Sequence, residues 1–441
     1  MAGGRDRFGP ALYLGGGLAL VGAAGYAFVA LTGHTLPPAD AAAAASLYLL
    51  VNIIGPGIFA ALEQETSRSV SAEIAAGRDP RPVTRNASIL AGALLVGVVA
   101  VLLAISPVLT NKALAGKWGL FAAVLLSVVT SAAVYAVRGL VGGRQRFTGY
   151  AATLGAEGVA RIVPCIVIAA SGAPNAVTFA IAFAAGSAFG ALAGLPWLRR
   201  PVELPEVRKS TAPASAGRMA RALSFLVGGT LLMLLAMNLA PIVVTPRLGA
   251  DAATAAAFAS AFVLARVPLF LFAPVQAVLL PSLTRAATRG ELGVVRARLR
   301  AILLAVAAIG LAGVLASFTV GPWAVQVLFG AEVRLSGAVV GLLGVSTVGL
   351  MVAQVLQPGL VALGRHKIVT LAWAAGTVAL VALLALPGDP LRAGVAGQLV
   401  ASALVVAVML TSLYRVLGAS RSGRSAKGVD PVSGDENVIK Q

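Results

Sequence analysis

Charged side chains are scarce in this chain of 441 residues, at 11% of the total against roughly 25% in a typical soluble domain. Hydrophobic residues make up 59%, and the mean hydropathy is +0.92. A soluble globular domain of this length is therefore excluded. The single cysteine, Cys165, lies in an apolar stretch, so the chain cannot form an internal disulfide.

Other absences narrow the chemistry further. There are two histidines, His34 and His366, in loops predicted on opposite sides of a membrane, so no metal site is expected. No Walker motif is present, and the triplet Gly15-Gly16-Gly17 has no lysine after it, which argues against ATP hydrolysis. We expect no cofactor.

Long apolar stretches fill the remaining sequence. Since about 20 apolar residues cross a bilayer as a helix, the pattern predicts twelve membrane-spanning helices and an all-α fold. We place them near 11–32, 44–64, 87–108, 117–138, 149–170, 175–197, 222–245, 252–282, 301–320, 336–361, 368–387 and 391–416.

Basic residues gather in every second gap between these spans. Of the 34 Lys and Arg residues, 27 fall on one side, five on the other and two, Arg161 and Arg266, inside spans. Basic loops stay in the cytoplasm, so the pattern predicts both termini there and an inner-membrane location in a bacterium. This distribution also explains the net charge of +18. We expect contacts with anionic membrane lipids and no binding of nucleic acid.

One long polar interruption divides the chain. We predict an N-terminal lobe at 1–197, a cytoplasmic linker at 198–221, a C-terminal lobe at 222–417 and a disordered tail at 418–441. The ends of the second and eighth spans are alike, with Pro56 and Pro274 each about eleven residues before a Ser/Thr-Arg pair. Two six-span halves keep the same orientation, so the repeat axis is expected along the membrane normal.

These features resemble the multidrug/oligosaccharidyl-lipid/polysaccharide (MOP) exporter superfamily. The stretch from Arg266-Val267-Pro268 to Pro281-Ser282-Leu283, and Leu62-Glu63-Gln64-Glu65-Thr66-Ser67-Arg68, are similar to its bacterial polysaccharide-biosynthesis, O-antigen-flippase-like branch. The resemblance implies a fold like that of the multidrug exporters. It also implies that two lobes alternate around a central cavity to move lipid-linked sugars or amphipathic cations.

Ionisable residues inside spans are the first candidates for a site, because a charge at the bilayer centre is costly. Arg266 can hold a pyrophosphate through its planar fork; the alternative is a structural pair between lobes. Glu157 and Arg161, four residues apart on one helical face, can form an internal ion pair or contact substrate. Gln276 and Asn52 are neutral polar candidates for a cavity that accepts sugar.

Two further sets of residues are candidates for conformational change between the lobes. Glu63, Glu65, Arg68 and Arg285 lie at the cytoplasmic ends of their spans, where they form either ordinary helix-end salt bridges or an inner gate. Helix-breaking prolines are hinge candidates, although each can equally be a static kink: Pro56, Pro268, Pro274 and Pro358.

Three function classes follow. The first is a flippase for an anionic polyprenyl-(pyro)phosphate glycan, since the charged cavity candidates are mostly basic. The second is a cation-coupled exporter of drugs or metabolites with the same fold. The third is a membrane glycosyltransferase or polymerase, which the short outer loops disfavour; we therefore expect no enzyme. A monomer that works with cytoplasmic glycosyltransferases is the expected form, because two internal lobes already enclose a cavity.

Overall fold

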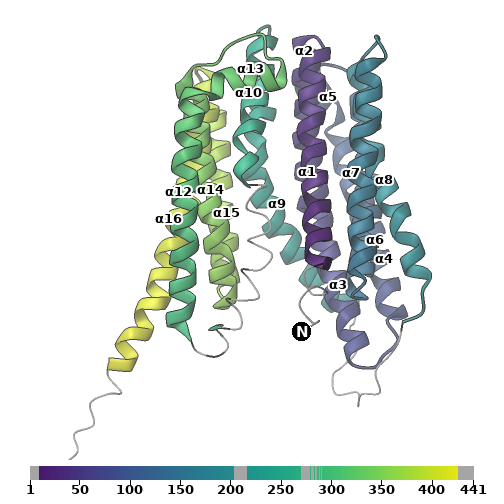
Figure 1. Ribbon diagram of the computed structural model, residues 1–441, viewed down its shortest axis with the longest axis vertical. Coiled ribbons are helices and arrows are strands. Elements are labelled where there is room, and N and C mark those ends of the chain that lie inside the picture. Colours follow the sequence, from purple (N-terminus) through teal and green to yellow (C-terminus); the bar gives the residue numbers. More distant parts are fainter. Residues whose placement is uncertain are drawn as a thin grey trace, which may run out of the picture.

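The computed structural model describes residues 9–202, 216–269, 279, 283, 286–287, 289 and 291–425. Within these residues, regular secondary structure is entirely helical, and twelve helices are long and apolar enough to cross a membrane. The predicted all-α class and number of spans are thus confirmed. The chain is a multi-pass membrane protein built from two groups of helices that stand side by side (Figure 1).

The first group is the N-terminal lobe. In chain order it contains α1 (Gly9–Thr35), α2 (Pro38–Ile54), the π-helical turn η1 (Gly55–Phe59), α3 (Ala60–Ala75), α4 (Arg81–Ala104), α5 (Ser106–Ala113), α6 (Trp118–Gly143), α7 (Phe147–Ala170) and α8 (Ala176–Arg199).

The second group is the C-terminal lobe. It contains α9 (Ala216–Arg247), α10 (Ala252–Ala265), α12 (Leu292–Thr319), α13 (Gly321–Phe329), α14 (Gly337–Ala362), α15 (His366–Ala385) and α16 (Pro390–Ser425). The first eight residues of the predicted tail therefore continue α16, and residues 426–441 lie outside the described part.

The two lobes share a further arrangement of helices, which the similarity between the second and eighth spans does not include. In each, the third span is followed at once by a short helix, α5 after α4 and α13 after α12. Both short helices carry a proline in their first turn, Pro107 and Pro322. Proline suits that position because the first N–H groups of a helix have no intrahelical acceptor. The repeated proline explains why the chain turns at the same point in both halves.

The second span is longer than expected. Prediction placed it at 44–64, whereas α2, η1 and α3 run without interruption over Pro38–Ala75, 38 residues. At 1.5 Å per residue, this is about 57 Å, well beyond a hydrocarbon core of roughly 30 Å. The extra length is polar and is held by the pairs Glu65–Arg68 and Glu73–Arg78, at 2.6 and 2.5 Å.

Helix α9 connects the lobes. Met219, in its first turn, is buried with Val70, Val83 and Ala87 of the N-terminal lobe. Further along, the carbonyl oxygens of α9 accept hydrogen bonds from side chains of the C-terminal lobe, Thr377 on α15 and Gln398 on α16. Figure 1 shows α9 running obliquely between the two groups. Because α8 reaches Arg199 and α9 begins at Ala216, the predicted linker 198–221 is in part helical.

Several arginines of the loops cap helix ends. At the end of the molecule that holds most basic loops, here called the basic end, Arg144 donates to the carbonyl oxygen of Leu198 at 2.6 Å, and Arg146 donates to those of Trp197 and Pro201. These carbonyls lie at or just beyond the C-terminus of α8, where a cation also complements the helix dipole. At the opposite end, Arg247 donates to Leu384 and Leu386 at the end of α15.

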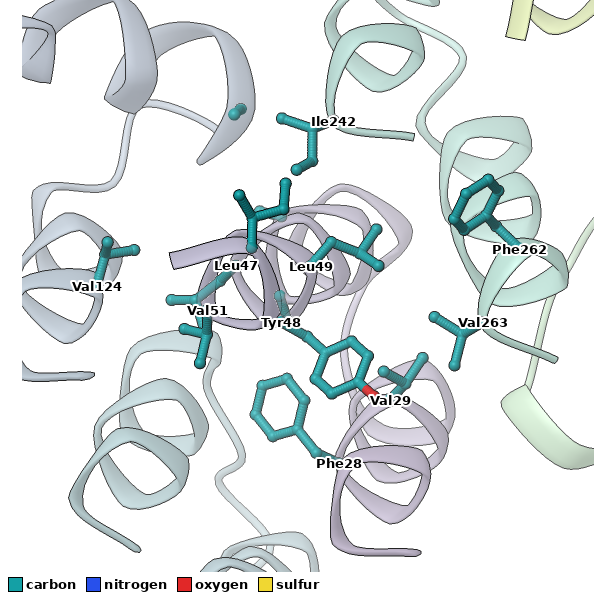
Figure 2. Close-up of a cluster of buried hydrophobic side chains, with 14 of the residues drawn as sticks. Phe28, Val29, Leu47, Tyr48, Leu49, Val51, Val124, Ile242, Phe262 and Val263 are labelled. Carbon is teal, nitrogen blue, oxygen red and sulfur yellow. The ribbon is translucent and has the colours of Figure 1, made fainter. Parts of the chain in front are cut away.

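A core of aromatic and aliphatic side chains joins the lobes away from the basic end. Figure 2 shows Phe28 of α1 and Tyr48 of α2 facing each other, with Phe262 and Val263 of α10 beyond them. The ring centroids of Phe28 and Phe183 are 4.6 Å apart, and those of Tyr48 and Phe183 are 6.0 Å apart. Burial of these rings from both lobes closes the molecule at this level.

Candidate functional site

A cavity of about 260 Å³ lies between the two lobes, next to this core. It is formed by α1, α2 and η1 on one side and by α9, α10 and α14 on the other. Most of its lining is apolar. The polar lining residues are Tyr26, Tyr48, Asn52, Asn238, Arg266 and Gln354.

Arg266 occupies a break in the eighth span. Helix α10 ends at Ala265, and the backbone turns at Arg266, whose N–H donates to the carbonyl oxygen of Val263 at 3.0 Å. Pro268 follows two residues later and has no N–H to continue an α-helical ladder. Arg266 lines the cavity at this break.

The guanidinium of Arg266 is fixed on three sides. It donates to Thr347 Oγ1 on α14 at 3.2 Å and to the carbonyl oxygen of Met237 on α9 at 2.9 Å. Its central carbon lies 4.4 Å from the centroid of the Phe262 ring, a cation–π distance. Two helices and one ring therefore hold the group in place before any ligand binds.

The charge of Arg266 has no counterion in the part of the chain that the structure describes. Only 6% of the residue is exposed, and among the described residues its Nε–H has no hydrogen-bond acceptor and no carboxylate lies within 4 Å of it. A buried charge without a partner is strongly unfavourable. An anion that enters the cavity would neutralise it, and a planar guanidinium suits phosphate oxygens.

Neutral amides surround this cation. Asn52 Nδ2 donates to the carbonyl oxygen of Tyr48 at 2.8 Å, and Asn238 Nδ2 donates to that of Leu234 at 3.0 Å. Each bond uses one amide N–H, so the amide oxygen and the second N–H take no part in it. Groups of this kind can bind the hydroxyls of a sugar.

Two tyrosines of the cavity were missed by the sequence analysis. Tyr48, Asn52 and Pro56 are spaced by four residues, which places them along one helical face, so the predicted residues Asn52 and Pro56 already pointed to Tyr48. Tyr26 stands alone on α1, and no sequence pattern marks it. Its place in the cavity depends on how α1 packs.

Glu157 and Arg161 lie in a different place, inside the N-terminal lobe, and neither lines the cavity. The expected pair exists: Arg161 Nη2 lies 2.7 Å from Glu157 Oε1. A second cation, Arg138 of α6, binds Glu157 Oε2 at 2.5 Å and donates to Thr153 Oγ1 at 2.9 Å. Ser187 of α8 donates to Glu157 Oε1 at 2.7 Å. Both oxygens of the Glu157 carboxylate are thus bound by side chains of the N-terminal lobe.

Glycines of α8 make room for this ion cluster. Gly186, Gly190 and Gly194 recur every four residues along the face toward α7. A Cβ at Gly190 would lie 2.9 Å from the carbonyl oxygen of Thr153 and 3.1 Å from Glu157 Cβ. Close approach of small-residue helices is a common way to pack in membranes. The cluster is consequently enclosed by backbone.

The predicted gate residues find partners within the N-terminal lobe. Arg68 donates to both oxygens of Glu65 at 2.9 and 2.6 Å; Glu65 is buried, while Arg68 is 65% exposed. Glu63 accepts a hydrogen bond of 2.5 Å from Tyr150 on α7. Within the part of the chain that the structure describes, neither carboxylate forms a hydrogen bond or ion pair with the C-terminal lobe. Arg285 lies outside the described residues, so the gate stays a prediction.

The hinge candidates differ in local geometry. Pro56 lies in the π-helical turn Gly55–Phe59, a form often found at functional sites. Pro268 follows the break at Arg266, whereas Pro358 lies within the continuous helix α14. Pro274 and the cavity candidate Gln276 lie outside the described residues.

The architecture is that of a helical membrane protein, and its fold is like that of solved transporters of the MOP superfamily. The chain aligns with a solved inward-facing multidrug resistance MATE family transporter of that superfamily at a TM-score of 0.66 and 17% identity, over 92% of this chain and 96% of that one. An outward-facing MATE transporter aligns at 0.61 and 16%, over 94% and 96%. The lipid II flippase MurJ, in an inward closed conformation, aligns at 0.61 and 11%, over 94% and 92%.

Sequence relatives come from mycobacteria. The uncharacterized protein Rv1510 of Mycobacterium tuberculosis is 27% identical over 85% of this chain and 84% of its own length. The uncharacterized protein Rv3630 of the same organism is 25% identical over 88% of each chain. No protein-family model matches the chain.

Proposed function

We propose that the protein is a flippase for a lipid-linked glycan, with Arg266 as the contact for the anionic polyprenyl-(pyro)phosphate. The observation that carries this proposal is the buried guanidinium of Arg266, without a carboxylate partner among the described residues, in a cavity between the lobes. A cation in such a position selects an anionic ligand, since a cationic one would meet direct repulsion.

The rest of the cavity supports the same class of substrate. The side-chain amides of Asn52, Asn238 and Gln354 are suited to sugar hydroxyls, and Tyr48 offers an aromatic face. The likeness of the fold to that of the lipid II flippase MurJ supports a flippase. In the proposed mechanism, the lobes alternate around the cavity of a monomer in the bacterial inner membrane, both termini are cytoplasmic, and glycosyltransferases there supply the substrate.

A cation-coupled exporter is the second candidate, because two of the solved structures that align with this chain are described as multidrug resistance transporters. Such an exporter is expected to present an acid to a cationic drug. Here Glu157 is bound by Arg138 and Arg161, and among the described lining residues of the cavity the charged one is Arg266. This arrangement favours the flippase. A membrane glycosyltransferase is less favoured, since no paired carboxylates occur among the described residues that line the cavity.

The test is a headgroup-accessibility assay in proteoliposomes that carry a fluorescent polyprenyl-pyrophosphate sugar. Wild type is compared with Arg266→Ala and with Arg334→Ala, which removes an exposed arginine far from the cavity. Translocation by wild type and Arg334→Ala, with loss in Arg266→Ala, supports the proposal. Equal translocation by all three proteins would support the flippase function and show that Arg266 is not the contact for the substrate. No translocation under an imposed proton or sodium gradient, together with efflux of a cationic dye, would support the exporter.

A further inference from the structure

The lobes meet backbone to backbone at the end of the molecule opposite the basic end, here called the outer end. The last turn of α1 lies against the end of α13. A Cβ at Gly330 would lie 2.7 Å from the carbonyl oxygen of Gly33 and 2.9 Å from His34 Cα, and a Cβ at Gly33 would overlap the carbonyl oxygen of Phe329. Gly330 has a φ of +64°, which favours glycine. This seam closes the outer end.

His34 is the polar side chain that spans the seam. Its Nδ1 lies 2.8 Å from the carbonyl oxygen of Ala30, one turn back on α1. Its Nε2 lies 3.2 Å from the carbonyl oxygen of Val327 on α13, in the other lobe. The imidazole thus contacts one acceptor in each lobe.

Both neighbours of the imidazole are acceptors only. A neutral imidazole carries one N–H, so it can donate to Ala30 or to Val327 but not to both, and its second nitrogen then faces a carbonyl lone pair. The imidazolium carries two N–H groups and donates to both. Protonation therefore converts one satisfied contact and one repulsive contact into two hydrogen bonds that join the lobes.

Two helix ends add to this effect. Ala30 lies near the C-terminus of α1, which ends at Thr35, and Val327 lies two residues before the end of α13 at Phe329. Each helix directs the negative end of its dipole toward His34, and a cation near a helix C-terminus is stabilised by that dipole. The contribution of α13 depends on its contact with α1, so it is present in this closed conformation and is lost if the lobes separate at this end.

We propose that His34 is a proton-binding site that couples closure of the outer end to the proton concentration outside the membrane. His34 is exposed, so protons reach it from solvent. The proposal rests on the alternation of the two lobes in the proposed function and is independent of which substrate is moved. A proton taken up from the outer side favours the outwardly closed form, which would return an emptied transporter to its inward-facing state.

Other charged groups lie at the same end. The helices packed around the outer part of α1 carry Asp40, paired with Lys117 at 2.5 Å, and Asp251, which caps α10 by accepting from the backbone N–H of Thr254. Glu332 and Arg334 follow α13, which itself carries no ionisable side chain. Among the described residues, none of these groups bonds to His34, whose partners are the carbonyls of Ala30 and Val327, and all remain in a His34 variant. A pH response that belongs to them would therefore survive its replacement.

The experiment measures the opening of the outer end directly. In a Cys165→Ala background, Lys112→Cys on α5 and Arg392→Cys on α16 provide exposed spin-label sites at the outer end of each lobe. Double electron–electron resonance in nanodiscs without substrate, from pH 8 to pH 5.5, reports the ratio of short to long distances. We expect this ratio to rise roughly two- to fivefold on acidification, the gain expected when a cation forms beside a helix C-terminus.

The chain contains its own control, because its second histidine, His366, lies at the basic end. His34→Gln keeps a donor but cannot titrate, so the pH response should disappear; His34→Ala should behave alike. His366→Gln should respond as wild type does. A response that persists in both His34 variants, or a single distance at every pH, would overturn the proposal. Translocation is measured separately in proteoliposomes. A wrong substrate assignment would therefore appear in the translocation assay and leave the spin-label distances unaffected.

Discussion

Arg266 donates a hydrogen bond to the carbonyl oxygen of Met237, which Pro241 leaves without its usual helical donor. In an α-helix, the carbonyl of Met237 would accept from the N–H of residue 241, but that residue is a proline and has none. Arg266, on a different helix, donates to this oxygen at 2.9 Å. The proline of α9 thus creates the acceptor that helps to fix the cation of the cavity.

Replacement of Pro241 by alanine should weaken this arrangement without harming the fold. The new N–H at position 241 competes with Arg266 for the Met237 carbonyl, so the guanidinium loses one of its two hydrogen bonds. A net hydrogen bond of about 1–1.5 kcal/mol corresponds to roughly a five- to tenfold lower translocation rate. Thermal unfolding in detergent should be unchanged or shifted upward. Pro246→Ala, on the same helix but away from Arg266, should leave the rate unchanged; equal effects of both would contradict this account.

The uncompensated charge of Arg266 predicts opposite effects on stability and on function. Arg266→Met keeps most of the volume and removes a buried cation that has no carboxylate partner among the described residues. The free energy of unfolding should stay the same or rise, since no counterion is left behind. Translocation should fall by roughly 10- to 100-fold, as expected for a lost charge-assisted contact of about 1.5–3 kcal/mol. A marked loss of stability would show that Arg266 is a structural residue.

Replacement of Glu157 should lower the stability of the protein, in contrast to replacement of Arg266. Arg138 and Arg161 both bind its carboxylate in an enclosed part of the N-terminal lobe. Glu157→Ala leaves two buried guanidinium groups without an anion, and breaking a buried pair typically costs about 3–5 kcal/mol. We expect a large drop in the unfolding temperature in detergent.

The control for that experiment is the exposed pair of Asp79 and Arg81, 3.9 Å apart. Asp79→Ala should change stability by no more than about 0.5 kcal/mol, because solvent screens the pair. If Glu157→Ala proved as harmless, the ion cluster would not be what holds α6, α7 and α8 together.

The glycine seam at the outer end predicts a conformational mutant. Gly33→Val places a branched side chain where the carbonyl of Phe329 lies, so the outer end cannot close. The long-distance population in the spin-label measurement should dominate at every pH. Gly97→Val, on α4 where nothing lies within 4 Å of a new Cβ, should retain the wild-type distribution. A closed outer end in Gly33→Val would show that the seam tolerates a side chain.

The membrane spans could be predicted because each depends on local information: a long apolar stretch bounded by basic or turn-forming residues. Arg266 and the pair Glu157–Arg161 were also found locally, since a charge inside a span stands out. The partners of these residues could not be predicted from the local sequence. Arg138 lies 19 residues before Glu157 and near the end of its helix, and whether it meets Glu157 depends on how α6 and α7 pack.

The grouping of the site residues was likewise beyond sequence reasoning. Arg161 and Arg266 look equivalent in the sequence, each a lone arginine in a span, yet Arg161 is bound by a carboxylate and Arg266 has none among the described residues. Asn238 and Gln354 join Arg266 in the cavity because α9, α10 and α14 converge there. Convergence of this kind is set by tertiary packing and leaves no periodic signal.

The capped end of α8 has a consequence for how freely the basic loops can vary. As markers of membrane orientation, Lys and Arg are interchangeable, and a loop could drift between them over evolutionary time. Arg146 donates to carbonyls at or just beyond the end of α8 through two guanidinium nitrogens, and Arg144 donates to that of Leu198 through one. A lysine at position 146 would preserve orientation and lose the two-nitrogen contact, and one at position 144 would present a compact ammonium in place of the planar group. Insertion into the membrane and assembly within it therefore impose separate requirements on the same two residues.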